Sequence, residues 1–280
     1  MAARKRKTNL GSRHGARASA QGGGTTIYVL GAIVAVGLLA GAIFLMNSTK
    51  NEMAVDPETL CPAETGPLAE TVVLFDVTDP LSVVQSNQLM QFLESEFTDA
   101  PVGTQFTMGI VSEDPSEWVA TAPLCKPRSE KDVSSLTQNV TMVKARYQER
   151  FLAPLEQNVS RMISASGSNS SPIMESLQAV IASTPGFLTF EGPRKVILVS
   201  DLLQHSDAMS FYRGEDWQAF SASPAFQRLG RTLDGVQIKI VSVPRVVAKI
   251  RDAGAIEDFW VNYFGQQGAQ LLATKHLGDL

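Results

Sequence analysis

The chain has 280 residues, of which 19% are charged, and a formal net charge of −4. This charge is unevenly distributed, because seven of the 24 basic residues and none of the 28 acidic residues lie in residues 1–50. Residues 51–280 therefore have a net charge of −11, which argues against nucleic-acid binding and suits a divalent cation.

The first 25 residues predict a disordered basic tail. They contain many glycine, serine and alanine residues and six basic residues without an acidic one, so they cannot bury a core. Residues 26–46 predict a transmembrane helix, because residues 27–46 are 20 uncharged residues that can span a hydrocarbon core of about 30 Å. A cleaved signal peptide is the alternative, and the missing small-x-small cleavage site after Met46 argues against it.

The charges on either side of the predicted span give its expected orientation. Six basic residues precede the span, whereas Lys50 after it is followed by Glu52, Asp56 and Glu58. The positive-inside rule places the N-terminus in the cytoplasm and the large C-terminal part outside it. We therefore expect a single-pass protein of a bacterial inner membrane with a periplasmic domain.

Two glycines in the span form a small-xxx-small pattern. Gly37 and Gly41 would let two helices approach closely, which predicts a homodimer as one option. Glycine is common in membrane spans, so composition alone also accounts for the pattern.

Residues 47–70 predict a linker, and residues 71–280 a single domain. The two cysteines, Cys61 and Cys125, both lie in the part that we expect in an oxidising compartment. An even pair there favours a disulfide. Two separate buried thiols are the alternative, because two loop positions need not lie within bonding distance.

Hydrophobic patterning within 71–280 predicts alternating strands and helices. In chain order, the expected elements are a strand at 71–76, a helix at 81–97, a strand at 106–111, a short strand near 117–121, helices at 147–162 and 173–183, a strand at 195–200, a helix at 216–230, a strand at 236–243 and a last helix that contains residues 256–264. This alternation predicts an α/β fold with a doubly wound, mostly parallel sheet and helices on both faces.

Aromatic residues gather in the last of these helices: Phe259, Trp260, Tyr263 and Phe264. We expect them to pack on the sheet. A face that docks a partner is the alternative.

Two aspartates follow apolar strands in this pattern. Asp76 ends the first strand and Asp201 follows the strand at 195–200, with Thr78 and Ser200 close by. In α/β proteins, residues at the carboxyl ends of parallel strands meet where ligands bind. Carboxylates and hydroxyls there suggest a site for a hard cation.

The order of these motifs resembles the von Willebrand factor A domain. The resemblance rests on Asp76-Val77-Thr78-Asp79-Pro80 after the first strand, Ser171-Pro172 at a helix start and Asp201 after a later strand. It implies a metal-ion-dependent adhesion site in which Asp76, Thr78, Ser171 and Asp201 hold Mg²⁺ or another divalent cation. An acidic side chain of a partner protein would fill the open coordination position. Pro80 departs from the family pattern, since it stands where a second serine is expected and offers no side-chain oxygen.

Helix capping is an alternative explanation for the same residues. Asp79-Pro80 and Ser171-Pro172 each resemble an N-cap residue followed by proline at the first helical position. Such pairs stabilise helix starts without any metal.

The sequence favours a binding module over an enzyme. A phosphatase-like or other envelope hydrolase using Asp76 is the alternative, but Thr78 stands where a second aspartate would act as general acid. His205, four residues after Asp201, is expected to be a solvated loop residue, with partner contact as the other option. We therefore expect a membrane-anchored, extracytoplasmic, noncatalytic domain that binds a protein at the carboxyl edge of its sheet.

Overall fold

The computed structural model describes residues 23–50, 54–76, 79–112, 120–135, 138–164, 170–230, 232–245 and 253–278. The chain divides into two compact units, Met1–Glu52 and Met53–Leu280.

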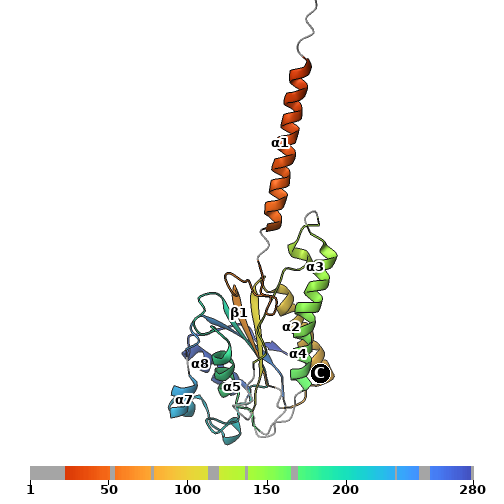
Figure 1. Ribbon diagram of the computed structural model, residues 1–280. Coiled ribbons are helices and arrows are strands. Elements are labelled where there is room, and N and C mark those ends of the chain that lie inside the picture. The colour runs from red at the N-terminus through yellow and green to blue at the C-terminus, as the bar shows by residue number, and fades with distance from the viewer. Residues whose placement is uncertain are drawn as a thin grey trace, which may run out of the picture. The chain divides into compact units, whose positions relative to one another are not determined.

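The first unit contains one described helix, α1 (Gly23–Lys50), drawn in red at the start of the colour bar (Figure 1). Among the described residues, no helix has both the length and the apolar character that crossing a membrane requires. A side chain added at Gly37 or Gly41 would meet no other atom within 4 Å. The span predicted over 26–46 and the homodimer through it stay predictions.

The second unit is built on a sheet with the strand order β3-β2-β1-β4-β5-β6, and β7 also pairs with β5. The strands are β1 (Ala69–Phe75), β2 (Thr104–Ile110), β3 (Leu124–Cys125), β4 (Arg194–Ser200), β5 (Val236–Ser242), β6 (Gln270–Leu271) and β7 (Lys275–His276). All pairs are parallel except β2–β3. This is the doubly wound order, so the predicted fold class is confirmed.

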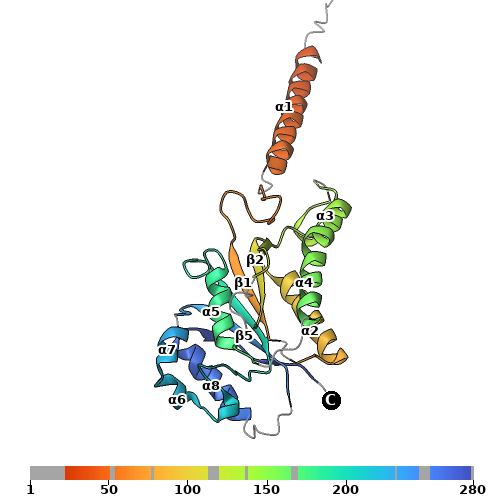
Figure 2. The same cartoon turned by 60° about the horizontal axis from the view of Figure 1, so that its bottom comes forward.

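Helices cover both faces of the sheet (Figures 1 and 2). One face carries α5 (Ile173–Ser183), α6 (Trp217–Ser221), α7 (Pro224–Leu229) and α8 (Ala253–Gln266). The other carries α2 (Val83–Asp99), α3 (Val140–Tyr147), η3 (Gln148–Leu152) and α4 (Ala153–Ser164). Short 3-10 turns lie at η2 (Glu130–Asp132) and η4 (Phe211–Arg213). The β4 side chains alternate between the two cores, as expected of a strand buried on both faces.

Side-chain burial confirms the predicted role of the aromatic residues in the last helix. Phe259, Trp260, Tyr263 and Phe264 are at most 1% exposed and pack in the core beneath α8. On the same face, α5 lies very close to β2, because a side chain at Gly109 would come within 2.8 Å of Val180. Only glycine fits there.

Two predicted helices differ in extent from the observed ones. The helix predicted at 216–230 is split into α6 and α7, because Pro224 has no N–H to continue a helix and begins α7 instead. The helix predicted at 147–162 runs from α3 through the π-turn η3 to the end of α4. The short strand predicted near 117–121 falls mostly outside the described residues, and the observed edge strand is β3.

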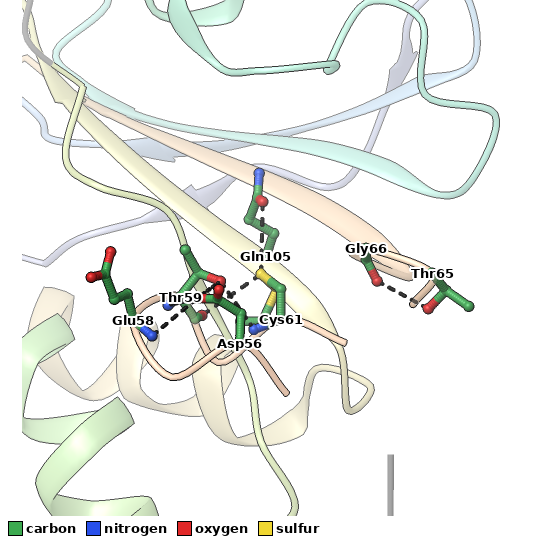
Figure 3. Close-up of a disulfide and its surroundings, with 8 residues drawn as sticks. Asp56, Glu58, Thr59, Cys61, Thr65, Gly66 and Gln105 are labelled. Carbon is green, nitrogen blue, oxygen red and sulfur yellow. Dashed lines mark hydrogen bonds between the residues drawn. A yellow bond between two sulfur atoms is a disulfide. The ribbon is translucent and has the colours of Figure 1, made fainter. Parts of the chain in front are cut away.

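Residues 54–68, within the predicted linker, fold back into the second unit. The Asp56 carboxylate accepts hydrogen bonds from the backbone N–H groups of Glu58 and Thr59, which stabilise a tight turn (Figure 3). Both hydrogen bonds lower the pKa of Asp56, and the bond from Thr59 contributes most. The turn leads to Cys61, which forms a disulfide with Cys125 of β3, so the predicted disulfide is confirmed. Both cysteines are buried.

We expect the disulfide to contribute strongly to stability, because it closes a loop between positions 64 residues apart. Chain-entropy arguments give about 4 kcal/mol for a loop of this size. Replacing both cysteines with alanine should lower the free energy of unfolding by up to that amount, measured by urea unfolding with tryptophan fluorescence as the probe. Reduced wild-type protein should match the variant. An unchanged unfolding midpoint after reduction would contradict this expectation.

A carboxyl group is buried at the amino end of the sheet. Glu70 in β1 is 2% exposed, and its Oε2 has no hydrogen-bond partner among the described residues. Burial raises the pKa of Glu70 to about 7, although the positive charge of Arg194, its register partner in β4, opposes the shift. The folded protein therefore holds the Glu70 proton more tightly than the unfolded chain does.

This shift predicts a pH dependence of stability. The free energy of unfolding should decrease as pH rises from about 4.5 to about 7, because the folded state binds the extra proton in that window. Glu70→Gln should remove this part of the dependence, so that urea midpoints of variant and wild type diverge with rising pH. The exposed Glu94→Gln is the matched control. Parallel curves for Glu70→Gln and wild type would refute the expectation.

Candidate functional site

The two aspartates predicted to lie together do follow neighbouring strands. Asp76 follows β1 and Asp201 follows β4, and the two strands pair in parallel. The backbone N–H of Asp76 donates to the carbonyl of Val199 at 2.8 Å, which continues the pairing beyond β1. Both carboxylates therefore lie at the carboxyl edge of the sheet, where doubly wound proteins bind ligands.

The Asp76 carboxylate is buried and accepts two hydroxyl hydrogen bonds. Its Oδ2 accepts from Ser200 Oγ at 2.7 Å and from Ser171 Oγ at 2.9 Å, and the residue is 4% exposed. Ser171 is positioned by backbone pairing, since its N–H and carbonyl both bond to His205. Asp76 thus connects the end of β1 to the end of β4 and to the segment before α5.

Asp201 lies in a buried turn beside this cluster. Its Oδ1 accepts a hydrogen bond from the backbone N–H of Leu203 at 2.9 Å. Burial raises the pKa of Asp201 to about 7, and the negative charge of Asp76 adds to the shift. The Leu203 hydrogen bond and the positive charge of Arg245 oppose it. The environment therefore favours a proton or a cation next to these carboxylates.

The turn after β4 has a strained backbone. Leu202 has a φ of 66°, in the left-handed region, which costs a non-glycine residue about 1–3 kcal/mol. Two bonds stabilise the turn: the Leu202 N–H donates to Ser200 Oγ at 2.7 Å, and the Trp260 indole donates to the Leu202 carbonyl at 2.9 Å. Backbone strain of this kind is often found at functional sites, and here these two hydrogen bonds hold the strained turn in place.

The structure brings three of the four predicted ligands together at this edge. Asp76, Ser171 and Asp201 lie there, and Thr78 falls outside the described residues. Ser200, which the sequence placed only nearby, contacts Asp76 directly. That the four residues bind a metal stays a prediction.

The capping explanation is wrong for both helices. Ser82, not Asp79, is the N-cap of α2, in a capping box with Gln85. At α5, the Ser171 hydroxyl bonds to Asp76, and the N–H of Met174 is satisfied by the Gln204 side chain instead. Neither predicted proline pair caps a helix as expected.

His205 contacts its neighbours more closely than a solvated loop residue would. Its Nδ1 lies 2.7 Å from Ser210 Oγ, and its ring lies 5.1 Å from that of Tyr212, measured between centroids. The residue is partly buried. Its main role in the structure is the backbone pairing that positions Ser171.

Arg245, which follows β5, contacts the loop after β1 without any signal in the sequence pattern. Its Nη2 donates to the Asp79 carbonyl at 2.7 Å and its Nη1 to the Pro80 carbonyl at 3.1 Å. Its Nε lies 4.0 Å from Asp79 Oδ2. A lone arginine after a strand gives no sequence signal, because only the fold brings it to this loop.

The oxygens at this edge are of the kind that hard cations prefer. Asp76 and Asp201 supply carboxylates and Ser171 a hydroxyl, and a cation would offset the burial and the repulsion from Asp76 that raise the pKa of Asp201. Within the described part of the chain, however, no group of three or more His, Cys, Asp and Glu side chains is arranged to hold a metal. A metal here would therefore depend on hydroxyl and water ligands as well.

No protein-family model and no curated protein matches the sequence. Solved structures of similar fold include an aerotolerance-related membrane protein from Bacteroides fragilis NCTC 9343, at 10% identity and a TM-score of 0.35, covering 76% of this chain and 92% of that one. Another is the manganese-loaded Plasmodium vivax TRAP protein, at 9% identity and a TM-score of 0.34, covering 73% and 68%.

A von Willebrand factor type A structure from Catenulispora acidiphila is also similar, at 11% identity and a TM-score of 0.33, covering 72% of this chain and 43% of that one. The second unit has the doubly wound α/β fold that the sequence resemblance implied.

The two serines at Asp76 should differ in their contribution to stability. Ser200→Ala removes two buried hydrogen bonds, to Asp76 and from Leu202, whereas Ser171→Ala removes the side-chain hydrogen bond to Asp76. An unsatisfied buried group costs about 1–3 kcal/mol, so we expect Ser200→Ala to be the more destabilising variant in urea unfolding. Equal or reversed losses would show that Ser200 is not the main support of the Asp76 carboxylate.

Proposed function

We propose that the second unit is a noncatalytic module that binds a partner protein at the carboxyl edge of its sheet. The observation that supports this most directly is that the buried Asp76 and the partly buried Asp201 lie at the ends of neighbouring parallel strands. Burying such charges is unfavourable, and stability alone gives little reason to keep two of them together.

Exposed apolar side chains surround this edge. Val83 and Val84, which begin α2 after the loop that contains Asp79, are 78% and 50% exposed. Tyr212 is 42% exposed, and its pKa is raised by burial and then by the charges of Asp201 and its neighbours. Aromatic and apolar residues around a few polar groups are typical of protein interfaces.

In this proposal, a divalent cation such as Mg²⁺ supports binding at the same edge. Asp76, Thr78, Ser171 and Asp201 would hold the ion. When bound, the ion supplies an open coordination position that an acidic side chain of the partner can fill. The chain itself contributes the buried oxygens and, through Ser200 and the turn at Leu202, the rigidity of the edge.

The phosphatase-like alternative fits the geometry less well. A nucleophilic Asp76 would need an oxygen exposed to substrate, but the residue is 4% exposed and its Oδ2 accepts two hydroxyl hydrogen bonds.

The proposal includes an extracytoplasmic location at a bacterial inner membrane. The disulfide between Cys61 and Cys125 supports an oxidising compartment, since such bonds are rare in the cytosol. The basic segment before the span predicted over 26–46 supports an N-terminus in the cytoplasm. A homodimer through Gly37 and Gly41 is a secondary part of the proposal.

Site-specific photo-crosslinking in the native cells tests this function. A photoreactive residue at Val83 should give a protein adduct, because Val83 is exposed beside the proposed edge. The matched control is Val261 in α8, which is 50% exposed and whose helix packs on the other side of the domain core from α2. Combining Val83 labelling with the near-isosteric Asp76→Asn should greatly reduce the adduct.

Adducts at both positions would indicate nonspecific contact and contradict the proposal. An adduct at Val83 that survives Asp76→Asn would leave a binding surface but reject the role of the aspartate pair. Formation of the Cys61–Cys125 disulfide in Asp76→Asn, checked on non-reducing gels, shows that the variant is folded.

A further inference from the structure

Two buried polar atoms without hydrogen-bond partners lie on neighbouring strands at the amino end of the sheet. Among the residues that the structure describes, Glu70 Oε2 in β1 accepts no hydrogen bond and Arg194 Nε in β4 donates none. The two residues are register partners. Val72 and Val196, two positions further along the same strands, pack in the core on the α5 side, so Glu70 and Arg194 belong to that face as well.

The guanidinium of Arg194 instead bonds to backbone carbonyls of two other segments. Its Nη2 donates to the Asp234 carbonyl at 2.7 Å, just before β5. Its Nη1 donates to the carbonyls of Phe187 and Leu188, both at 3.4 Å, in the loop 184–193 that joins α5 to β4. Bonds of this length are weak, so the loop is the contact that Arg194 loses most easily.

Glu70 lies against the same loop and meets few polar groups. Its register partner in β2 is the neutral Gln105. A side chain added at Gly186 of the loop would lie 3.9 Å from Glu70 Oε1. The guanidinium of Arg194 is the charge that acts on the Glu70 carboxyl group.

The other charged residues of the adjoining segments are screened by solvent or lie away from Glu70. Glu64 and Glu191 are exposed, so water and salt weaken their fields. Lys195 pairs with Glu96 on the opposite face of the sheet. The Asp234 carboxylate lies beside Gly268, and the last turn of α5 has no ionisable residue.

We propose that Arg194 exchanges partners with the charge state of Glu70, and that this exchange loosens the 184–193 loop. When Glu70 is neutral, the guanidinium stays on the loop carbonyls. When Glu70 is charged, its carboxylate draws the guanidinium into an ion pair through Nε, and both unpartnered atoms are then satisfied. A charge-assisted bond is about twice as strong as a neutral one, which favours the exchange. This inference goes beyond the proposed function and does not involve the carboxyl edge.

The burial of Glu70 sets the pH at which the exchange takes place. Burial raises the pKa of Glu70 to about 7, and Arg194 opposes the shift. Below this pH the carboxyl group is neutral and the loop keeps its bonds to Arg194. Above it the carboxylate forms and takes the arginine. The loop is therefore held on the acidic side and loosened on the alkaline side.

Hydrogen exchange of the purified full-length chain, followed by mass spectrometry, tests this inference. Protection factors remove the intrinsic pH dependence of exchange and are compared at about pH 5.5 and about pH 8.5, on either side of the Glu70 pKa. In the loop, the N–H groups of Phe187 and Thr189 donate to backbone carbonyls and report its order. Their protection should be about fivefold lower at the higher pH, the effect of losing one hydrogen bond of ordinary net strength.

Two variants separate the exchange from other effects of pH. Glu70→Gln is neutral at every pH, so its loop should keep the acidic-side protection at both values. Arg194→Gln removes the guanidinium, so its loop should be less protected at both values and show no pH dependence. The matched control is Glu94→Gln, which removes an exposed carboxylate and should behave as wild type. The Cys61–Cys125 disulfide on non-reducing gels shows that each variant is folded.

Equal loop protection at the two pH values in wild type would overturn the inference. So would a pH dependence that persists in Glu70→Gln or in Arg194→Gln. Peptides from the core helix α8 provide the remaining comparison and need no variant. If they lose as much protection as the loop does, ionised Glu70 destabilises the whole domain and no local exchange takes place.

Discussion

The buried carboxylate of Asp76 is the interaction on which the arrangement of the site depends. Its two hydroxyl bonds reach Ser200 at the end of β4 and Ser171 before α5, and its backbone continues the pairing of β1 with β4. One side chain therefore fixes three segments that are far apart in sequence. The turn at Leu202 and the pairing of Ser171 with His205 lie directly beside that connection.

The sequence predicted the central strands of the domain well, because strands buried on both faces consist of runs of apolar, β-branched residues. The runs ending at Asp76 and before Asp201 placed β1 and β4, and with them both carboxylates. Helix extent was less predictable. Pro224 split one helix, and Ser82 rather than Asp79 capped another, because Gln85 completes a capping box with Ser82.

The remaining parts of the site could not be predicted because they depend on contacts between segments distant in sequence. Arg245 follows β5 and meets a loop more than 160 residues earlier in the chain, with separations of 165 and 166 residues for its two hydrogen bonds. Likewise, Gln204 satisfies the start of α5 from the loop after β4. Local sequence patterns contain no information about such long-range pairs. Arginine and glutamine can each form the hydrogen bonds observed here, but the sequence does not identify their partners.

If the domain is anchored through its N-terminus, as proposed, the disulfide has a mechanical consequence. A pulling force that enters the chain before Cys61 divides there between the segment leading to β1 and the covalent bond to β3. The loop between Cys61 and Cys125 cannot lengthen when the chain is stretched between its N-terminus and any point after Cys125. The strand that leads to Asp76 is thus protected from being peeled out of the sheet by such a load.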